Sequence, residues 1–190
     1  MKKILKIIAI TLISLNANCQ TLPLLSPEEV NNGGYYKDLN NVLPFWVDTW
    51  KGQVNNKEYT FEFVFFEHSF IDFPSGSYYY KDKLMGKFKV VDLTTGNILY
   101  NDLNILNLED YKIRFLSNNI YNGYSFALFD NSNNFYNTVE FQLIKNPNNS
   151  NQILYTSFEY YNYLKIDCPF ANQIDIPMFL PKVDLVLTRQ

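Results

Sequence analysis

The sequence is poor in the residues that most often carry chemistry. It has one histidine, His68, and two cysteines, Cys19 and Cys168, among its 190 residues. A metal site with two or three histidines is therefore excluded, and a zinc site would need carboxylates beside a cysteine. A Ser-His-Asp triad would have to use His68, but no Gly-x-Ser-x-Gly elbow is present. We interpret His68 as an ordinary loop or strand-end residue and predict no catalytic residue, metal or cofactor.

Positive charge, phosphate loops and long apolar runs are scarce as well. The formal net charge is -3, whereas a nucleic-acid partner requires a basic surface. Gly33-Gly34 is not followed by the Lys-Ser/Thr of a phosphate loop. No apolar stretch approaches the roughly 20 residues that a membrane-spanning helix needs. We therefore expect no nucleic acid among the partners, which are otherwise unknown, and no transmembrane segment once the N-terminal signal is removed.

Residues 1–19 have the pattern of an export signal. Lys2, Lys3 and Lys6 form its charged region, and Ile7 to Leu15 form its apolar region. The apolar region is too short to span a bilayer. The pattern predicts an exported protein, either periplasmic or secreted.

Three ways of processing this signal are open. Cleavage before Cys19 with lipid on its sulfur would anchor the protein, although Asn18 stands where a small residue usually precedes a lipidated cysteine. Cleavage after Ala17 would leave Cys19 free to bridge Cys168 if the two Cα atoms come within about 7 Å. Cleavage after Cys19 places Ala17 and Cys19 at the two small-residue positions of the recognition site. We favour this last site, which leaves Gln20 as the mature N-terminus, with lipid anchoring through Cys19 as the alternative.

Aromatic residues are abundant and alternate with polar ones, which is typical of β-strands. The sequence has 16 Phe and 15 Tyr. Within Pro44 to Phe66, the residues that share one face of a strand are Tyr59, Phe61, Phe63 and Phe65. Asn55-Asn56 before them suits a two-residue hairpin turn, because asparagine tolerates positive φ. The stretch is predicted as the first hairpin, with Val47 to Val54 as the partner strand.

The rest of the chain continues this pattern and lacks helical periodicity. Further strands are predicted at Lys87–Asp92, Ile98–Tyr100, Tyr111–Phe115, Tyr124–Leu128, Phe135–Leu143, Ile153–Phe158 and Val183–Thr188. Two segments, Glu67 to Lys83 and Cys168 to Pro181, resist a strand interpretation and are expected as a long loop and an irregular crossing. We predict an all-β fold, an antiparallel, lipocalin-like barrel of about eight to ten strands, with a sandwich as the alternative.

The domain organisation follows from these segments. We expect a signal at 1–19, an N-terminal arm at 20–43 and a single barrel domain at 44–190. Pro23 leaves 21–25 no room for regular structure, whereas Ser26 to Glu29 could start a short helix that Asn31 to Gly34 ends after about one turn. We expect the arm to cover one end or edge of the sheet, which protects an edge strand from aggregation.

Several short motifs resemble those of a family of small secreted proteins of unknown function from Flavobacterium-like bacteria. They are Cys19-Gln20, Thr21 to Leu24, Tyr36 to Asn41, Thr49 to Gly52 and Leu185 to Gln190. The resemblance covers most of the chain and implies no activity and no site residues. The first strand is also similar to that of lipocalin-type barrels, which carry Gly-x-Trp there; here Asp48 takes the place of that glycine.

The leading functional hypothesis is a non-enzymatic barrel that binds a small apolar or amphipathic ligand. Trp50, Phe61 and Phe63 would line its interior, although a small barrel is equally well filled by its own side chains. An alternative is a surface module that binds a glycan or a protein through exposed tyrosines. Its candidate residues are Tyr78, Tyr79 and Tyr80, together with Tyr160, Tyr161 and Tyr163.

A carboxylate-based hydrolase is the third hypothesis, and its best carboxylate pair has the wrong spacing. Glu58 and Glu62 share a strand face. At 3.3 Å per residue they would be about 13 Å apart, which exceeds both geometries of glycoside hydrolases. We therefore interpret these glutamates as a solvated strand face.

Overall fold

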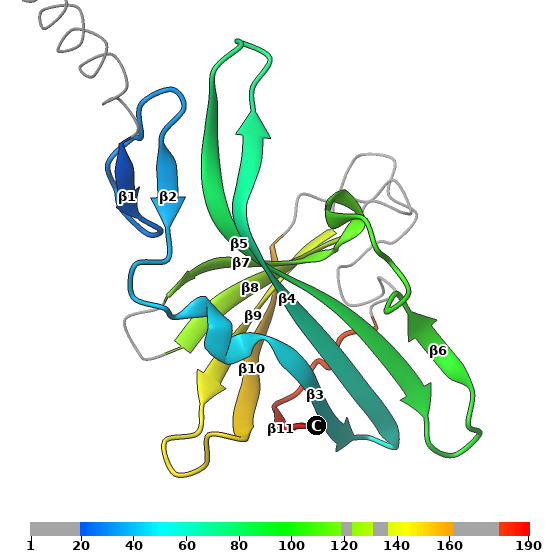
Figure 1. The fold of residues 1–190 in the computed structure, drawn as a ribbon. Helices are drawn as coiled ribbons and strands as arrows, with labels where there is room; N and C mark the ends of the chain where they lie inside the picture. Colours follow the sequence, from blue (N-terminus) through cyan, green and yellow to red (C-terminus); the bar gives the residue numbers. More distant parts are fainter. Residues whose placement is uncertain (1–19, 119–122, 131–136, 162–178) are drawn as a thin grey trace, which may run out of the picture. The chain divides into compact units, whose positions relative to one another are not determined.

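A computed structural model describes residues 20–118, 123–130, 137–161 and 179–190. These residues form two compact units (Figure 1). The barrel unit comprises 43–65 and the described residues from 84 onwards, and the hairpin unit comprises 20–42 and 66–83. Ala17, Cys19 and Cys168, on which the processing prediction depends, lie outside the described residues, as do Tyr163 and most of the predicted crossing.

Nearly all regular structure in the described residues is β. The only helices there are the 3-10 turns η1 (Leu43–Trp46) and η2 (Leu108–Asp110). The strands are β1 (Thr21–Pro23), β2 (Tyr35–Lys37), β3 (Asp48–Val54), β4 (Lys57–Asp72), β5 (Tyr78–Asp92), β6 (Ile98–Asn101), β7 (Ile113–Asn118), β8 (Gly123–Asp130), β9 (Asn137–Lys145), β10 (Gln152–Tyr161) and β11 (Leu185–Arg189). The all-β prediction is confirmed.

Eight of these strands form a closed antiparallel barrel in the order β5-β4-β3-β11-β10-β9-β8-β7. Closure comes from β5 pairing with β7, where Met85 faces Arg114 and Gly86 faces Ile113. A Cβ on Gly86 would lie 2.8 Å from the Phe63 ring, so only glycine fits at this crossing. The barrel is confirmed over the sandwich, and closure leaves its strands without open edges.

The first hairpin forms as predicted, with its first strand one residue shorter. Asn55 and Asn56 have φ angles of 52° and 57°, the left-handed pair that a tight hairpin turn requires. The register then places Trp50 opposite Phe61. Val47 precedes β3 and is largely exposed.

The interior of the barrel is built from large apolar side chains on alternate strand positions. Phe61 stacks on Phe88 and Tyr155 at centroid distances of 5.9 Å each, and Phe126 stacks on Phe141 at 5.7 Å. Each of these aromatic residues is at most 1% exposed. Burial of this kind supplies most of the stability of a small domain, at roughly 1.5–3 kcal/mol per side chain.

The prediction of a long loop from Glu67 to Lys83 is wrong. β4 continues to Asp72 and β5 starts at Tyr78, so most of the segment is a β-hairpin. Only 73–77 form the turn, which is closed by the Phe73 amide donating to the Ser77 carbonyl at 2.9 Å. Pro74 and Gly76 lie within this turn and do not interrupt either strand.

The last strand begins later than predicted. β11 starts at Leu185, and Leu185 and Leu187 are buried as expected. Val183 precedes the strand and is 44% exposed, so the predicted start of this strand at Val183 is wrong. The proline at 181 and the bends that follow it delay the extended conformation.

In the hairpin unit, the N-terminal arm adds strands to the edge of β5. The arm prediction is therefore wrong in two places, because Pro23 ends β1 and 26–29 form no helix. β1 pairs with β2 in parallel, with Thr21 opposite Tyr35. β2 then pairs in parallel with β5, with Tyr35 opposite Tyr80. The arm therefore covers the edge of this part of β5, as expected for a segment that protects an edge strand.

Candidate binding groove

The three residues predicted to line the barrel interior are deeply buried. Trp50 and Phe61 are 0% exposed, and Phe63 is 1% exposed. Phe63 lies 5.2 Å from the Phe126 ring, and the Trp50 indole donates to the Trp46 carbonyl at 2.9 Å. Their inward orientation fits the predicted strand face, and their described neighbours are the protein's own side chains.

The three predicted tyrosines fall on two faces of the hairpin unit. Tyr78 and Tyr80 lie beside Phe70, with ring centroids 5.5 and 5.7 Å from it. Tyr79 points to the opposite face and packs on Phe73 at 5.6 Å and on Tyr36 at 5.4 Å. This division follows from the two-residue period of a strand.

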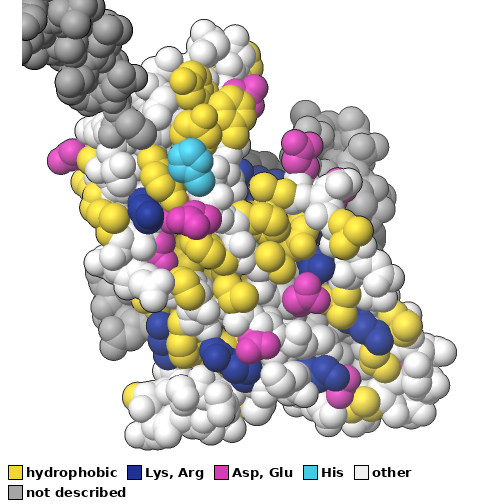
Figure 2. All heavy atoms as spheres, viewed as in Figure 1, with side chains coloured by type: hydrophobic (Ala, Val, Ile, Leu, Met, Phe, Trp, Pro, Cys, Tyr) yellow, Lys and Arg dark blue, Asp and Glu magenta, His cyan; other side chains and the backbone are white. Residues whose placement is uncertain are grey.

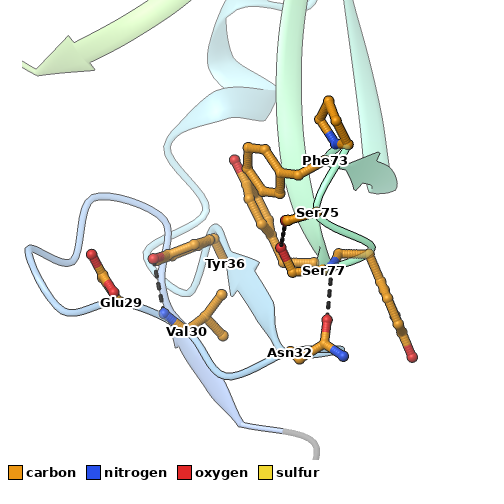
Figure 3. Close-up of a pocket in the computed structure, with 10 residues that line it drawn as sticks. Glu29, Val30, Asn32, Tyr36, Phe73, Ser75 and Ser77 are labelled. Atoms are coloured by element: carbon orange, nitrogen blue, oxygen red, sulfur yellow. Dashed lines mark hydrogen bonds between the residues drawn. The ribbon is translucent and has the colours of Figure 1, made fainter.

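The face that carries Tyr79 contains a groove of about 700 Å³ (Figure 3). Figure 3 shows Val30 and Tyr36 of the N-terminal arm on the left and Phe73 and Ser77 of the hairpin turn on the right, with Asn32 of the arm below Ser77. Aromatic rings and small polar groups therefore meet from two segments that are far apart in the sequence. The lining residues are Glu29, Val30, Asn32, Tyr36, Phe73, Pro74, Ser75, Ser77, Tyr78 and Tyr79.

The polar groups of the groove are partly fixed by the protein. Asn32 accepts a hydrogen bond from the Tyr78 amide at 2.7 Å through its side-chain oxygen, which leaves its NH₂ group to donate. The hydroxyls of Ser75 and Ser77 bond to each other at 2.8 Å. Tyr36 donates to the Glu28 carbonyl at 2.9 Å and accepts from the Val30 amide at 3.0 Å. These contacts hold the groove's wall in place without a ligand.

Two further groups are available to a ligand. The Glu29 carboxylate and the Tyr79 hydroxyl have no hydrogen-bond or ion-pair partner among the described residues. Burial, and then the charge of Tyr36, raise the pKa of Tyr79, so its hydroxyl stays protonated at neutral pH and donates as well as accepts.

Asp82 anchors the N-terminal arm to the hairpin from the face opposite the groove. Its carboxylate is 2% exposed and accepts from the Tyr35 hydroxyl at 2.5 Å, the Asp38 amide at 2.8 Å and the His68 amide at 3.0 Å. Burial and the bond to Asp82 raise the pKa of Tyr35. A buried carboxylate needs such donors, so these bonds position β2 and, with it, Tyr36.

His68 is stacked on the other face of the hairpin unit. Its ring lies 3.9 Å from Tyr80, nearly parallel, and 4.6 Å from Tyr35, edge-on. Its φ of 54° marks an irregularity in β4 that turns the side chain onto these rings. Figure 2 shows the histidine, in cyan, beside hydrophobic side chains. His68 lies within β4, so its predicted position in a loop or at a strand end is wrong.

The carboxylates that suggested a hydrolase are engaged with lysines. Glu62 lies 2.9 Å from the ammonium of Lys87, and Glu58 lies 3.8 Å from that of Lys51. Lys87 is 4% exposed and also donates to the Leu103 carbonyl at 2.8 Å. Burial lowers the pKa of Lys87, but Glu62 outweighs this, and the net shift is upward. Among the described residues, no group of three or more His, Cys, Asp or Glu is placed to hold a metal ion.

The sequence pointed to only two of the groove's residues, Tyr78 and Tyr79. Asn32 and Tyr36 were assigned to an arm, and Phe73 and Ser77 to a loop. The signal that could have joined them is the pair of aromatic clusters, Tyr35-Tyr36 and Tyr78-Tyr79-Tyr80, which β2–β5 pairing brings together. Parallel pairing between such distant segments leaves no turn signature in the sequence.

The fold places the chain in the class of small all-β barrel proteins. A family model matches residues 1–189, and the chain belongs to that family, described as a family of unknown function (DUF6705). No curated protein and no solved structure matches the chain. In the part of the chain that the structure describes, no helix is long and apolar enough to cross a membrane.

Proposed function

We propose that the protein binds carbohydrate in the groove of the hairpin unit, and that the barrel serves as its scaffold. The observation that carries this proposal is the lining of the groove. Tyr36, Phe73 and Tyr79 supply ring surface there, and asparagine and serine side chains lie among them.

This combination matches the chemistry of a sugar ring. A pyranose presents apolar C–H faces that pack on aromatic rings, and a rim of hydroxyls that both donate and accept hydrogen bonds. Asn32, Ser75 and Tyr79 offer groups of both kinds at the groove wall. The volume of about 700 Å³ lies within the range of small-molecule sites, which suits a short stretch of a sugar chain.

Export is part of the same proposal. The charged and apolar regions of 1–19 have the order of a secretory signal, and glycans are abundant outside the cytoplasm. We expect the exported chain to begin at Gln20. Intact-mass measurement of protein from the culture medium or periplasm tests this: an added diacylglycerol, or a two-hydrogen loss that joins Cys19 to Cys168, would overturn it.

An apolar or amphipathic ligand inside the barrel is the second candidate, and one observation favours it. The Tyr155 hydroxyl is buried and has no hydrogen-bond partner among the described residues. An unsatisfied buried hydroxyl costs about 1–3 kcal/mol, and a ligand's polar group would remove that cost. The close stacking of Phe61, Phe63 and Tyr155 favours the groove over this interior site.

Two phenylalanines in the hairpin unit provide a matched test. Phe73 lines the groove and Phe70 lies on the opposite face, and the two are 45% and 56% exposed. Calorimetry of the purified protein against a panel of oligosaccharides should find a ligand whose affinity falls about tenfold in Phe73→Ala, the scale of losing one stacked ring.

The control variant Phe70→Ala should bind that ligand like wild type. Asn32→Ala provides a second test, because it removes a polar group of the groove without removing a ring. Equal affinity in wild type, Phe73→Ala and Asn32→Ala, with all variants folded by thermal melting, would contradict the groove as the binding site.

A further inference from the structure

We infer that the sugar chain taken by this groove carries free amino groups, so that it is a cationic, glucosamine-type polymer. This inference rests on the proposed carbohydrate-binding function and names its substrate class. It is carried by the charge of the groove's lining.

Among the described residues that line the groove, Glu29 is the one that carries a charge. Its carboxylate has no partner among the described residues, and the residue before it, Glu28, adds a second exposed carboxylate. Within the hairpin unit, Glu67 by contrast is paired with Lys37 at 3.7 Å. An anionic sugar would meet unbalanced negative charge at Glu29, whereas an ammonium would form an ion pair there.

The aromatic lining of the groove also favours a positively charged ligand. The faces of Tyr36, Phe73 and Tyr79 are the negative side of the ring quadrupole, and they attract cations within about 6 Å of their centroids. The Tyr36 and Tyr79 rings stand at 86° to each other, so they offer faces in two directions. A sugar with an ammonium in place of a hydroxyl keeps the stacking surface and adds both attractions.

The lysine that follows Tyr79 on β5, Lys81, does not oppose this arrangement. Lys81 follows Tyr79 on the same face of β5 but does not line the groove. Its side chain is half-buried, and this burial lowers the pKa of its ammonium. Glu29 therefore discriminates between the two kinds of sugar, because its carboxylate repels an anionic sugar and attracts an ammonium.

The test compares substitution of Glu29 with substitution of its neighbour, Glu28. Binding of a glucosamine tetramer, its N-acetylated counterpart and a glucuronate tetramer is measured on the full-length protein at low salt. We expect the glucosamine tetramer to bind most tightly, and Glu29→Gln to weaken it about two- to fivefold, the scale of an exposed ion pair. Glu28→Gln, a change of the same charge beside the groove, should have a smaller effect.

The N-acetylated tetramer distinguishes a failure of this inference from a failure of the proposed carbohydrate binding. Its affinity should be unchanged by Glu29→Gln, since it carries no ammonium. If it binds as tightly as the glucosamine tetramer, or if the glucuronate tetramer binds best, the inference is overturned and carbohydrate binding stands. If none of these sugars and no neutral oligosaccharide binds, the proposed function itself has failed.

Discussion

Phe61 and Phe70 lie on the same strand, β4, and have opposite environments. Phe61 belongs to the barrel unit and is 0% exposed, among the rings of Phe88, Phe141 and Tyr155. Phe70 belongs to the hairpin unit and is 56% exposed. Aromatic alternation therefore produces a core in one unit and an accessible surface in the other. In the hairpin unit this accessible surface includes Phe73, which lines the groove and which we propose contacts the ligand.

The largest expected effect comes from placing a charge at each of these two positions. Phe61→Asp buries an unpaired carboxylate, which costs several kcal/mol out of a total stability of about 5–15 kcal/mol. We expect this variant to lose its cooperative thermal transition, whereas Phe70→Asp should stay within about 0.5 kcal/mol of wild type. If Phe61→Asp melts like wild type, the assignment of Phe61 to the core is wrong.

A smaller, local effect is expected in the hairpin unit when its anchor is removed. Asp82→Ala leaves the Tyr35 hydroxyl and the amides of Asp38 and His68 without their acceptor. The expected cost is about 3 kcal/mol, measured as faster amide hydrogen exchange in β2 and in the outer part of β4.

The control for this variant is Glu67→Ala, which removes an exposed ion pair in the same unit and should cost less than about 1 kcal/mol. The barrel strands should keep their exchange protection in both variants. Loss of protection throughout the barrel in Asp82→Ala would show that stability is not divided between the units as we describe.

The smallest effect is expected at Tyr155, the residue that bears on the second candidate function, a ligand inside the barrel. Burial raises the pKa of Tyr155 well above its usual value. The contribution of Tyr155 to the free energy of unfolding is therefore fully present below pH 10. It falls as the pH rises further, because the tyrosine ionises more readily in the unfolded chain. Above pH 10, Tyr155 should lower the free energy of unfolding of the wild-type protein by about 1.4 kcal/mol per pH unit. The Tyr155→Phe variant should not show this decrease.

At neutral pH the same variant should be more stable by about 1 kcal/mol, since the buried hydroxyl has no partner among the described residues. Denaturant unfolding at pH 7 and pH 11 checks both expectations. Destabilisation at pH 7 would show that this hydroxyl is satisfied by a bound molecule, which would favour the barrel interior as a ligand site.

The sequence predicted the barrel because its signals are local. Asn55-Asn56 specifies a tight turn, and the alternation through Phe61 and Phe63 specifies the buried face. The groove could not be predicted in the same way, because it depends on pairing between β2 and β5. The irregular backbone of His68 and the turn at Pro74 also obscured two strands whose residues are suited to strand formation.

The central claim is that ligand binding belongs to the hairpin unit, and amide hydrogen exchange with and without a bound oligosaccharide tests it most directly. The sugar that binds most tightly in the panel is added at saturating concentration. We predict increased protection at Asn32 and across Ser75 to Tyr79, with the amides around Phe61 and Tyr155 unchanged. Protection confined to the barrel strands, with none in the groove, would contradict the account.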